Sequence, residues 1–85
     1  MSPKDDGPDV AGWVASLARD LVDQPDAVEV RVVEEDGADV VELTVSPDEM
    51  GRVIGRQGRT VQAMRMLLDA AGEKFGRTYD LEILE

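Results

Sequence analysis

Two residue types are missing from this 85-residue sequence, cysteine and histidine. Without cysteine there is no disulfide and no thiolate ligand for a metal, and the composition suits a reducing cytosol. Without histidine there is no imidazole to act as a general base or a zinc ligand. The serine and threonine hydroxyls therefore lack the usual activating base, and nucleophilic catalysis is not expected. We predict a protein that is not an enzyme and that uses no cofactor or metal.

Long apolar stretches are also missing. The first eight residues are polar and rich in proline, glycine and aspartate, unlike a signal peptide. No later run approaches the length of a membrane span. We expect a cytoplasmic protein with a disordered tail over residues 1–8 and one domain over residues 9–85.

Positive charge is scarce, and it is concentrated in one part of the chain. The formal net charge is -10, which should repel a polyanion at long range. Residues 1–49 hold 14 acidic and 3 basic side chains, residues 50–77 hold 2 acidic and 6 basic ones, and residues 78–85 hold 3 acidic ones. The cations of the middle segment indicate a possible binding face, whereas the acidic surface is expected mainly to maintain solubility.

The first part of the domain predicts a helix that begins after Asp9, a good N-cap, and ends before Pro25. Its apolar residues follow helical spacing and should all face the core. This stripe contains Val10, Trp13, Val14, Leu17, Ala18, Leu21 and Val22.

A β-hairpin is expected next. Residues 27–34 and 39–45 alternate apolar and other side chains, and the Asp36-Gly37 pair between them is typical of a tight turn. The carboxylates around this turn lack the spacing of a calcium loop. The predicted buried faces consist of Val28, Val30 and Val32 on the first strand and Val41, Leu43 and Val45 on the second.

Two helices and a strand complete the pattern. Ser46 and Glu49 predict a capping box that opens a short helix, and Gly55 is well placed to end it in a left-handed conformation. A long helix should begin near Arg59 and end at Gly76. Its core positions are predicted at Val61, Met64, Leu68, Ala71 and Phe75, widened by Leu67 and Ala70, and a last strand alternates at Tyr79, Leu81 and Ile83.

This order, α-β-β-α-α-β, predicts an α+β fold in which three helices cover one face of a three-stranded sheet. The third strand should be a mixed or antiparallel edge strand, and its partner is left open.

The segment from Val53 to Val61, Val-Ile-Gly-Arg-Gln-Gly-Arg-Thr-Val, places two glycines between the two later helices. It is not a Walker A loop, because Val53 stands where the first glycine is required and Arg59 replaces the lysine. A dinucleotide-binding fingerprint also fails, since it too requires glycine at position 53 and a preceding strand. A loop between two helices with bare amides and arginines suits an anionic ligand.

The segment closely resembles the signature of the KH RNA-binding family, Val-Ile-Gly-x-x-Gly-x-x-(Ile/Val). The helix-first order is similar to the type II KH arrangement, and residues 46–60 resemble the small bacterial single-KH proteins of the KhpA family. The resemblance covers residues 9–84 and implies binding of single-stranded RNA.

The resemblance implies a role for each residue of the loop. Gly55 and Gly58 would permit close approach of the RNA backbone, and Arg56 and Gln57 would contact phosphates. An apolar floor and surrounding positive charge would come from Val53, Ile54, Val61, Arg52 and Arg59. For the three apolar residues, core packing is an equal alternative, and Arg65 is expected on a solvated helix face.

The resemblance also implies partners. Proteins of this kind are thought to self-associate and to pair with a larger KH-containing protein of the Jag type, in post-transcriptional control of cell shape and envelope growth or as RNA chaperones. The alternative is a protein-interaction adaptor or dimerisation module in which RNA contact is secondary.

Overall fold

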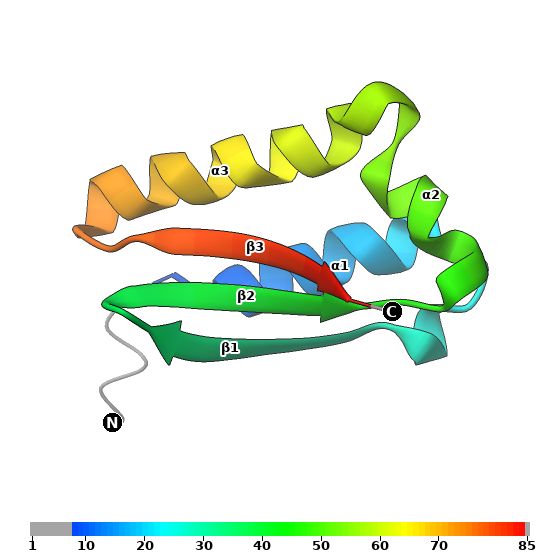
Figure 1. Cartoon of the computed structure of the whole chain (residues 1–85), viewed down its shortest axis with the longest axis horizontal. Helices are drawn as coiled ribbons and strands as arrows, with labels where there is room; N and C mark the ends of the chain where they lie inside the picture. Colours follow the sequence, from blue (N-terminus) through cyan, green and yellow to red (C-terminus); the bar gives the residue numbers. More distant parts are fainter. Residues whose placement is uncertain (1–7, 85) are drawn as a thin grey trace.

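The computed structural model describes residues 8–84 of the chain. Residues 1–7, most of the tail predicted to be disordered, lie outside this range. The elements follow the predicted order, with short 3₁₀ turns between them (Figure 1). They are α1 (Val10–Leu21), a turn (Pro25–Ala27), β1 (Glu29–Glu35), β2 (Ala38–Thr44), a turn (Pro47–Glu49), α2 (Met50–Ile54), a turn (Arg56–Gly58), α3 (Arg59–Phe75) and β3 (Tyr79–Leu84).

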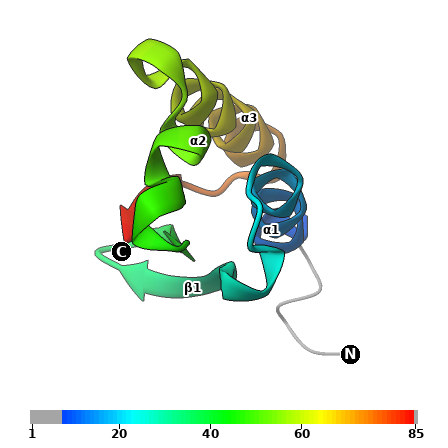
Figure 2. The ribbon, with the colours of Figure 1, turned by 90° about the vertical axis from the view of Figure 1, so that its right-hand side faces the viewer.

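The three strands form one mixed sheet in the order β1-β2-β3. β1 and β2 are antiparallel, and β3 is parallel to β2, which identifies the partner that the sequence left open. All three α-helices lie on the same face of the sheet (Figure 2). The predicted α+β class is therefore confirmed.

The hairpin turn between β1 and β2 is the two-residue turn expected from its sequence. Asp36 and Gly37 both have positive φ, 52° and 83°, as a type I′ turn requires. The register pairs Glu35 with Ala38 directly across the turn. This register turns Val41 and Leu43 of the central strand toward the helices, and both side chains are fully buried.

The core is narrower than the sequence pattern indicated. On α1 the buried residues are Val10, Val14, Ala15 and Ala18, and Trp13, predicted in the core, is 39% exposed. Seven apolar side chains expected on core faces are exposed, namely Trp13, Leu17, Leu21, Val32, Leu67, Ala70 and Phe75. A three-stranded sheet is too narrow to cover the full apolar width of two helices, and β1 is an edge strand with no neighbour beyond it.

The capping box predicted at Ser46 is wrong. The Ser46 hydroxyl donates to Asp48 Oδ1 over 3.0 Å, and no side chain caps the turn. Glu49 is buried, with 4% of its surface exposed. Its carboxylate accepts hydrogen bonds from the backbone N–H groups of Asp23 and Gln24, the latter at 3.0 Å. Glu49 thus binds the chain just after α1 instead of closing its own turn.

We predict that Glu49→Gln lowers the free energy of unfolding by about 2 kcal/mol, because an amide in place of the carboxylate loses charge-assisted bonds to partly buried donors. Urea titration measures the change. Asp48→Asn, one residue away and exposed, is the control and should have little effect. Equal stability of the two variants would contradict the anchoring role of Glu49.

Candidate functional site

The loop between α2 and α3 projects from one end of the molecule (Figure 1). α2 ends at Gly55, whose amide donates to Gly51 O over 2.9 Å, and the Gly58 amide then donates to Gly55 O over 3.0 Å. Gln57 and Gly58 are both left-handed, with φ of 58° and 73°. This tight turn leads directly into α3, whose first amide, that of Arg59, donates to the carbonyl of Arg56 in the turn. The amides that follow in the first turn of α3 have no partner within the helix.

Gly55 is confined by its neighbour Thr60. Its φ of 80° matches the positive value expected, but its ψ of 168° is extended and not the helical left-handed cap that was predicted. A Cβ at this position would lie 2.3 Å from Thr60 Oγ1 and 2.9 Å from the Thr60 amide nitrogen. The loop backbone therefore packs directly on α3, and Thr60 is a structural partner that the sequence did not indicate.

The polar side chains of the loop face solvent. Arg56, Gln57 and Arg59 are exposed, and Arg59 Nη2 donates to Gln57 Oε1 over 3.3 Å. Within residues 8–84, neither Arg56 nor Arg59 is ion-paired with a carboxylate. Arg52, also exposed, pairs with Asp23. The loop therefore presents two guanidinium groups with no acidic partner in the described chain.

The predicted apolar floor divides into a buried and a half-buried part. Val53 is fully buried and Val61 is 7% exposed, so both side chains lie beneath the surface. Ile54 is half-buried and packs against the core. Only Ile54 of the three offers substantial apolar surface next to the loop.

Arg65 lies on the flank of α3 that faces β3. Its Nη2 donates to the carbonyl of Leu81 over 3.4 Å, and the contact is partly buried. The solvated helix face expected for this residue is therefore only part of its environment, because the exposed side chain also reaches across to the sheet.

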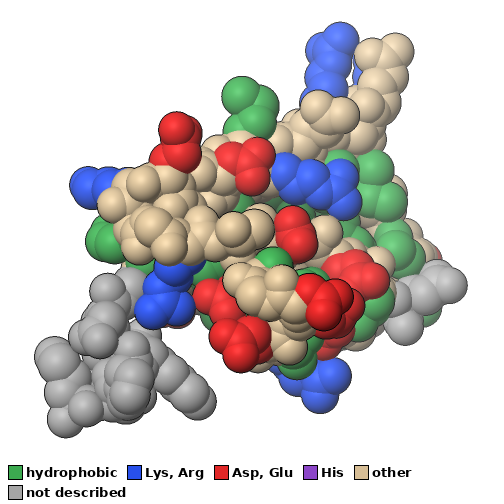
Figure 3. Space-filling model, turned by 60° about the vertical axis from the view of Figure 1, so that its left-hand side comes forward, with side chains coloured by type: hydrophobic (Ala, Val, Ile, Leu, Met, Phe, Trp, Pro, Cys, Tyr) green, Lys and Arg blue, Asp and Glu red, His purple; other side chains and the backbone are tan. Residues whose placement is uncertain are grey.

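Acidic side chains gather at the other end of the molecule. Figure 3 shows them clustered where the β1–β2 hairpin lies. The hairpin and its flanks carry Glu34, Glu35, Asp36 and Asp39. Within residues 8–84, no group of acidic side chains is arranged to hold a metal ion, and none of the helices is both long and apolar enough to cross a membrane.

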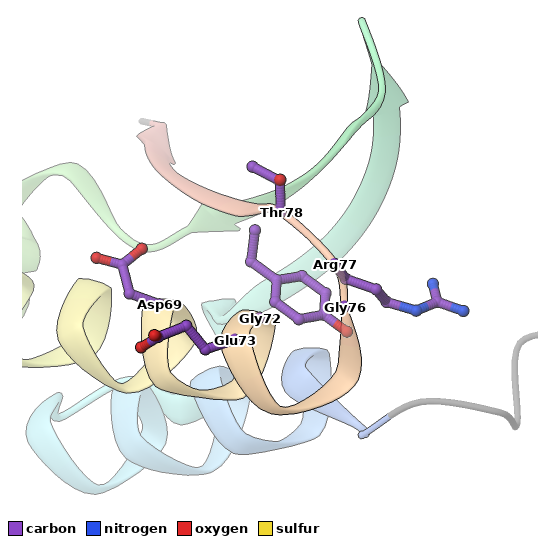
Figure 4. A pocket seen from close by; sticks show the side chains of 7 residues that line it. Asp69, Gly72, Glu73, Gly76, Arg77 and Thr78 are labelled. Atoms are coloured by element: carbon purple, nitrogen blue, oxygen red, sulfur yellow. The ribbon is translucent and has the colours of Figure 1, made fainter.

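An open hollow of about 510 Å³ lies at the C-terminal end of α3, away from the loop (Figure 4). The carboxylates of Asp69 and Glu73 stand on one side of it, and the guanidinium of Arg77 extends away from them (Figure 4). Arg77 is ion-paired with Asp39 at 3.3 Å. Two carboxylates in a wide hollow disfavour an anionic ligand. The hollow is therefore not a second binding site for the kind of ligand that suits the loop.

Comparison with known proteins gives a consistent family. Residues 12–83 match the family model described as KhpA/KhpB, KH domain. The chain is 48% identical over 72 residues to a protein of Aquifex aeolicus, covering 85% of this chain and 91% of the relative. It is 45% identical over 71 residues to one of Caldanaerobacter subterraneus, covering 84% and 95%. Both relatives are named RNA-binding protein KhpA.

A solved structure resembles the whole described fold. It is the crystal structure of Era in complex with MgGDPNP and nucleotides 1506–1542 of 16S ribosomal RNA, with a TM-score of 0.58 and 22% sequence identity. The match covers 98% of this chain and 33% of that chain. At this identity the likeness concerns the fold alone.

We predict that the two loop glycines differ in their tolerance of a methyl group. Gly55→Ala should lower the free energy of unfolding by roughly 3 kcal/mol or more, because strain at positive φ adds to the clash with Thr60. Gly58→Ala should cost only about 1 to 2 kcal/mol of left-handed strain, since its nearest neighbour would be Val61 Cγ1 at 3.9 Å. Urea titration of both variants tests this, and equal losses would show that the contact with Thr60 is unimportant.

Proposed function

This chain belongs to the KhpA/KhpB family of KH domains, and we propose that it binds single-stranded RNA through the loop Gly55-Arg56-Gln57-Gly58. The observation that carries the proposal is the loop itself. It is a glycine-framed turn held tightly against α3, with Arg56 and Arg59 exposed beside it and unpaired with any described carboxylate. The names of the relatives, RNA-binding protein KhpA, support the same ligand.

The loop would hold the sugar-phosphate backbone of about four nucleotides, as in KH domains generally. The tight turn brings backbone amides and the positive end of the α3 dipole to one place, which favours a phosphate. Arg56 and Gln57 extend from the turn and would contact neighbouring phosphates. Arg59 is held beside them by its hydrogen bond to Gln57 and would add positive charge.

Bases would lie on the apolar surface next to the loop. Ile54 supplies its exposed part, whereas Val53 and Val61 support it from the core below. Arg52, two residues before Ile54, stands nearly opposite it around α2 and would add charge where a strand passes beyond this helix.

Such a site grips few nucleotides, so binding should be weak and only modestly selective. Two or three neutralised phosphates correspond to a salt-dependence slope of about -1.5 to -2 for single strands. We propose that the protein acts in the cytoplasm as a post-transcriptional regulator or RNA chaperone, gaining affinity by pairing with a second KH module.

The loop is tested by reversing its charge. Arg56→Asp combined with Gln57→Asp should abolish binding of short labelled single-stranded RNAs in fluorescence anisotropy at low salt, because phosphates would meet two carboxylates. Position 57 tolerates aspartate, since Asp adopts positive φ more readily than most residues.

The matched control is Arg19→Asp combined with Ser16→Asp, which changes the net charge by the same amount on the exposed surface of α1. This control should retain most of the binding, and thermal melts should show that both variants fold. Equal loss of binding in both would mean that net charge decides the result, and undiminished binding by the loop variant would refute the proposed site.

A second function, association with another protein, is favoured by a separate observation. Trp13, Leu17 and Leu21 are 39%, 40% and 37% exposed and, being four residues apart, line one flank of α1. On α3, Leu67 is 43% exposed and lies nearly opposite Arg65 around the helix, on the flank away from β3. We propose that this helical apolar surface contacts a second copy of the chain or a larger KH-containing protein of the Jag type.

We predict that Leu17→Glu weakens self-association by at least about tenfold, because an unpaired charge would be buried at the contact. Analytical ultracentrifugation over a concentration series measures the dissociation constant. Arg19→Gln changes the net charge by the same amount at an exposed position nearly opposite Leu17 around α1, and it should leave association nearly unchanged. If the unmodified protein is a monomer at every concentration, the proposal of self-association through this surface is wrong.

A further inference from the structure

Arg52 differs from Arg56 and Arg59 because its guanidinium is already paired with an acidic side chain. Its Nη2 lies 3.2 Å from Asp23 Oδ2, and its Nη1 donates to Asp23 Oδ1 over 3.4 Å. The two nitrogens thus engage the two carboxylate oxygens as a fork, the geometry that guanidinium groups also use for phosphate. Both side chains are accessible, with exposed fractions of 55% for Arg52 and 74% for Asp23.

The backbone of Asp23 is held in place by a third residue, Glu49. Its N–H donates to the buried carboxylate of Glu49, and the next amide, that of Gln24, donates to the same carboxylate. Glu49 directly precedes α2, the helix that carries Arg52. The chain segments bearing both partners are therefore fixed relative to each other, which keeps the Arg52 and Asp23 side chains within reach of one another.

We propose that Asp23 acts as a built-in competitor for RNA, occupying Arg52 in the way that a phosphate would. This inference rests on the proposed function of the loop. An RNA strand that reaches from the loop along α2 must displace the Asp23 carboxylate to use Arg52. The displaced carboxylate remains next to the strand and repels it. Asp23 therefore sets the affinity of the site below what its arginines would otherwise provide.

The neutral isostere Asp23→Asn tests this directly, because it keeps the backbone N–H that binds Glu49. Fluorescence anisotropy with a short single-stranded RNA should show binding about two- to fivefold tighter at low salt, the range that corresponds to an exposed ion pair. The slope of log K against log salt should steepen by about 0.7, because one further phosphate is neutralised.

Two variants with the same net charge serve as controls. Asp36→Asn lies in the hairpin turn and Asp26→Asn lies three residues beyond Asp23, and neither side chain is paired with Arg52. If either control tightens binding and steepens the slope as much as Asp23→Asn does, the effect belongs to net charge and the competition is refuted.

A double-mutant cycle with Arg52→Gln separates the inference from the proposed function. If Asp23 competes with RNA for Arg52, then in the Arg52→Gln background Asp23→Asn should raise RNA affinity no more than the two control variants do. If the unmodified protein binds through its loop but Asp23→Asn binds no better, the competition is wrong while RNA binding by the loop stands. If no variant binds RNA, Asp23→Asn included, both are wrong.

Discussion

The buried carboxylate of Glu49 links the end of α1 to the start of α2. A carboxylate with 4% of its surface exposed would be costly to bury without compensation. Here it receives two charge-assisted hydrogen bonds from partly buried amides that follow α1. Because Glu49 directly precedes α2, this one contact sets the position of α2 against α1. The position of the loop that follows α2 depends on it in turn.

A strongly acidic protein can present a site for a polyanion if its charges are spatially separated. The molecule is 36 Å long, and the acidic hairpin and the projecting loop lie toward opposite ends (Figure 1). At physiological ionic strength the screening length is about 8 Å. The hairpin carboxylates are therefore largely screened at the loop. Whether a polyanion can bind at the loop therefore depends more on the local charge around Arg56 and Arg59 than on the total of -10.

The sequence predicted what depends on neighbouring residues and failed where distant segments decide. The Asp9 cap, which accepts from the Gly12 amide, and the Asp36-Gly37 turn are local and were both correct. Trp13 has the spacing of a core residue, but whether the sheet reaches it depends on the number of strands. Glu49 has the spacing of a capping box, but its carboxylate binds instead the two amides after α1, which are 26 and 25 residues earlier in the chain. For the loop, the glycines and arginines could be named from the motif, whereas the burial of Val53, the contact with Thr60 and the pairing of Arg52 required tertiary structure.

The parallel pairing of β2 with β3 places the loop inside a crossover connection. Parallel neighbours need a long connection, and here it consists of α2, the loop and α3. Lengthening or cutting the chain at the loop would disturb the element that joins the two strands. The hairpin joins its strands locally, and a Cβ at Gly37 would have nothing within 4 Å. For protein engineering, the hairpin turn is thus the natural place to insert a label or fuse another domain, at a distance from the loop.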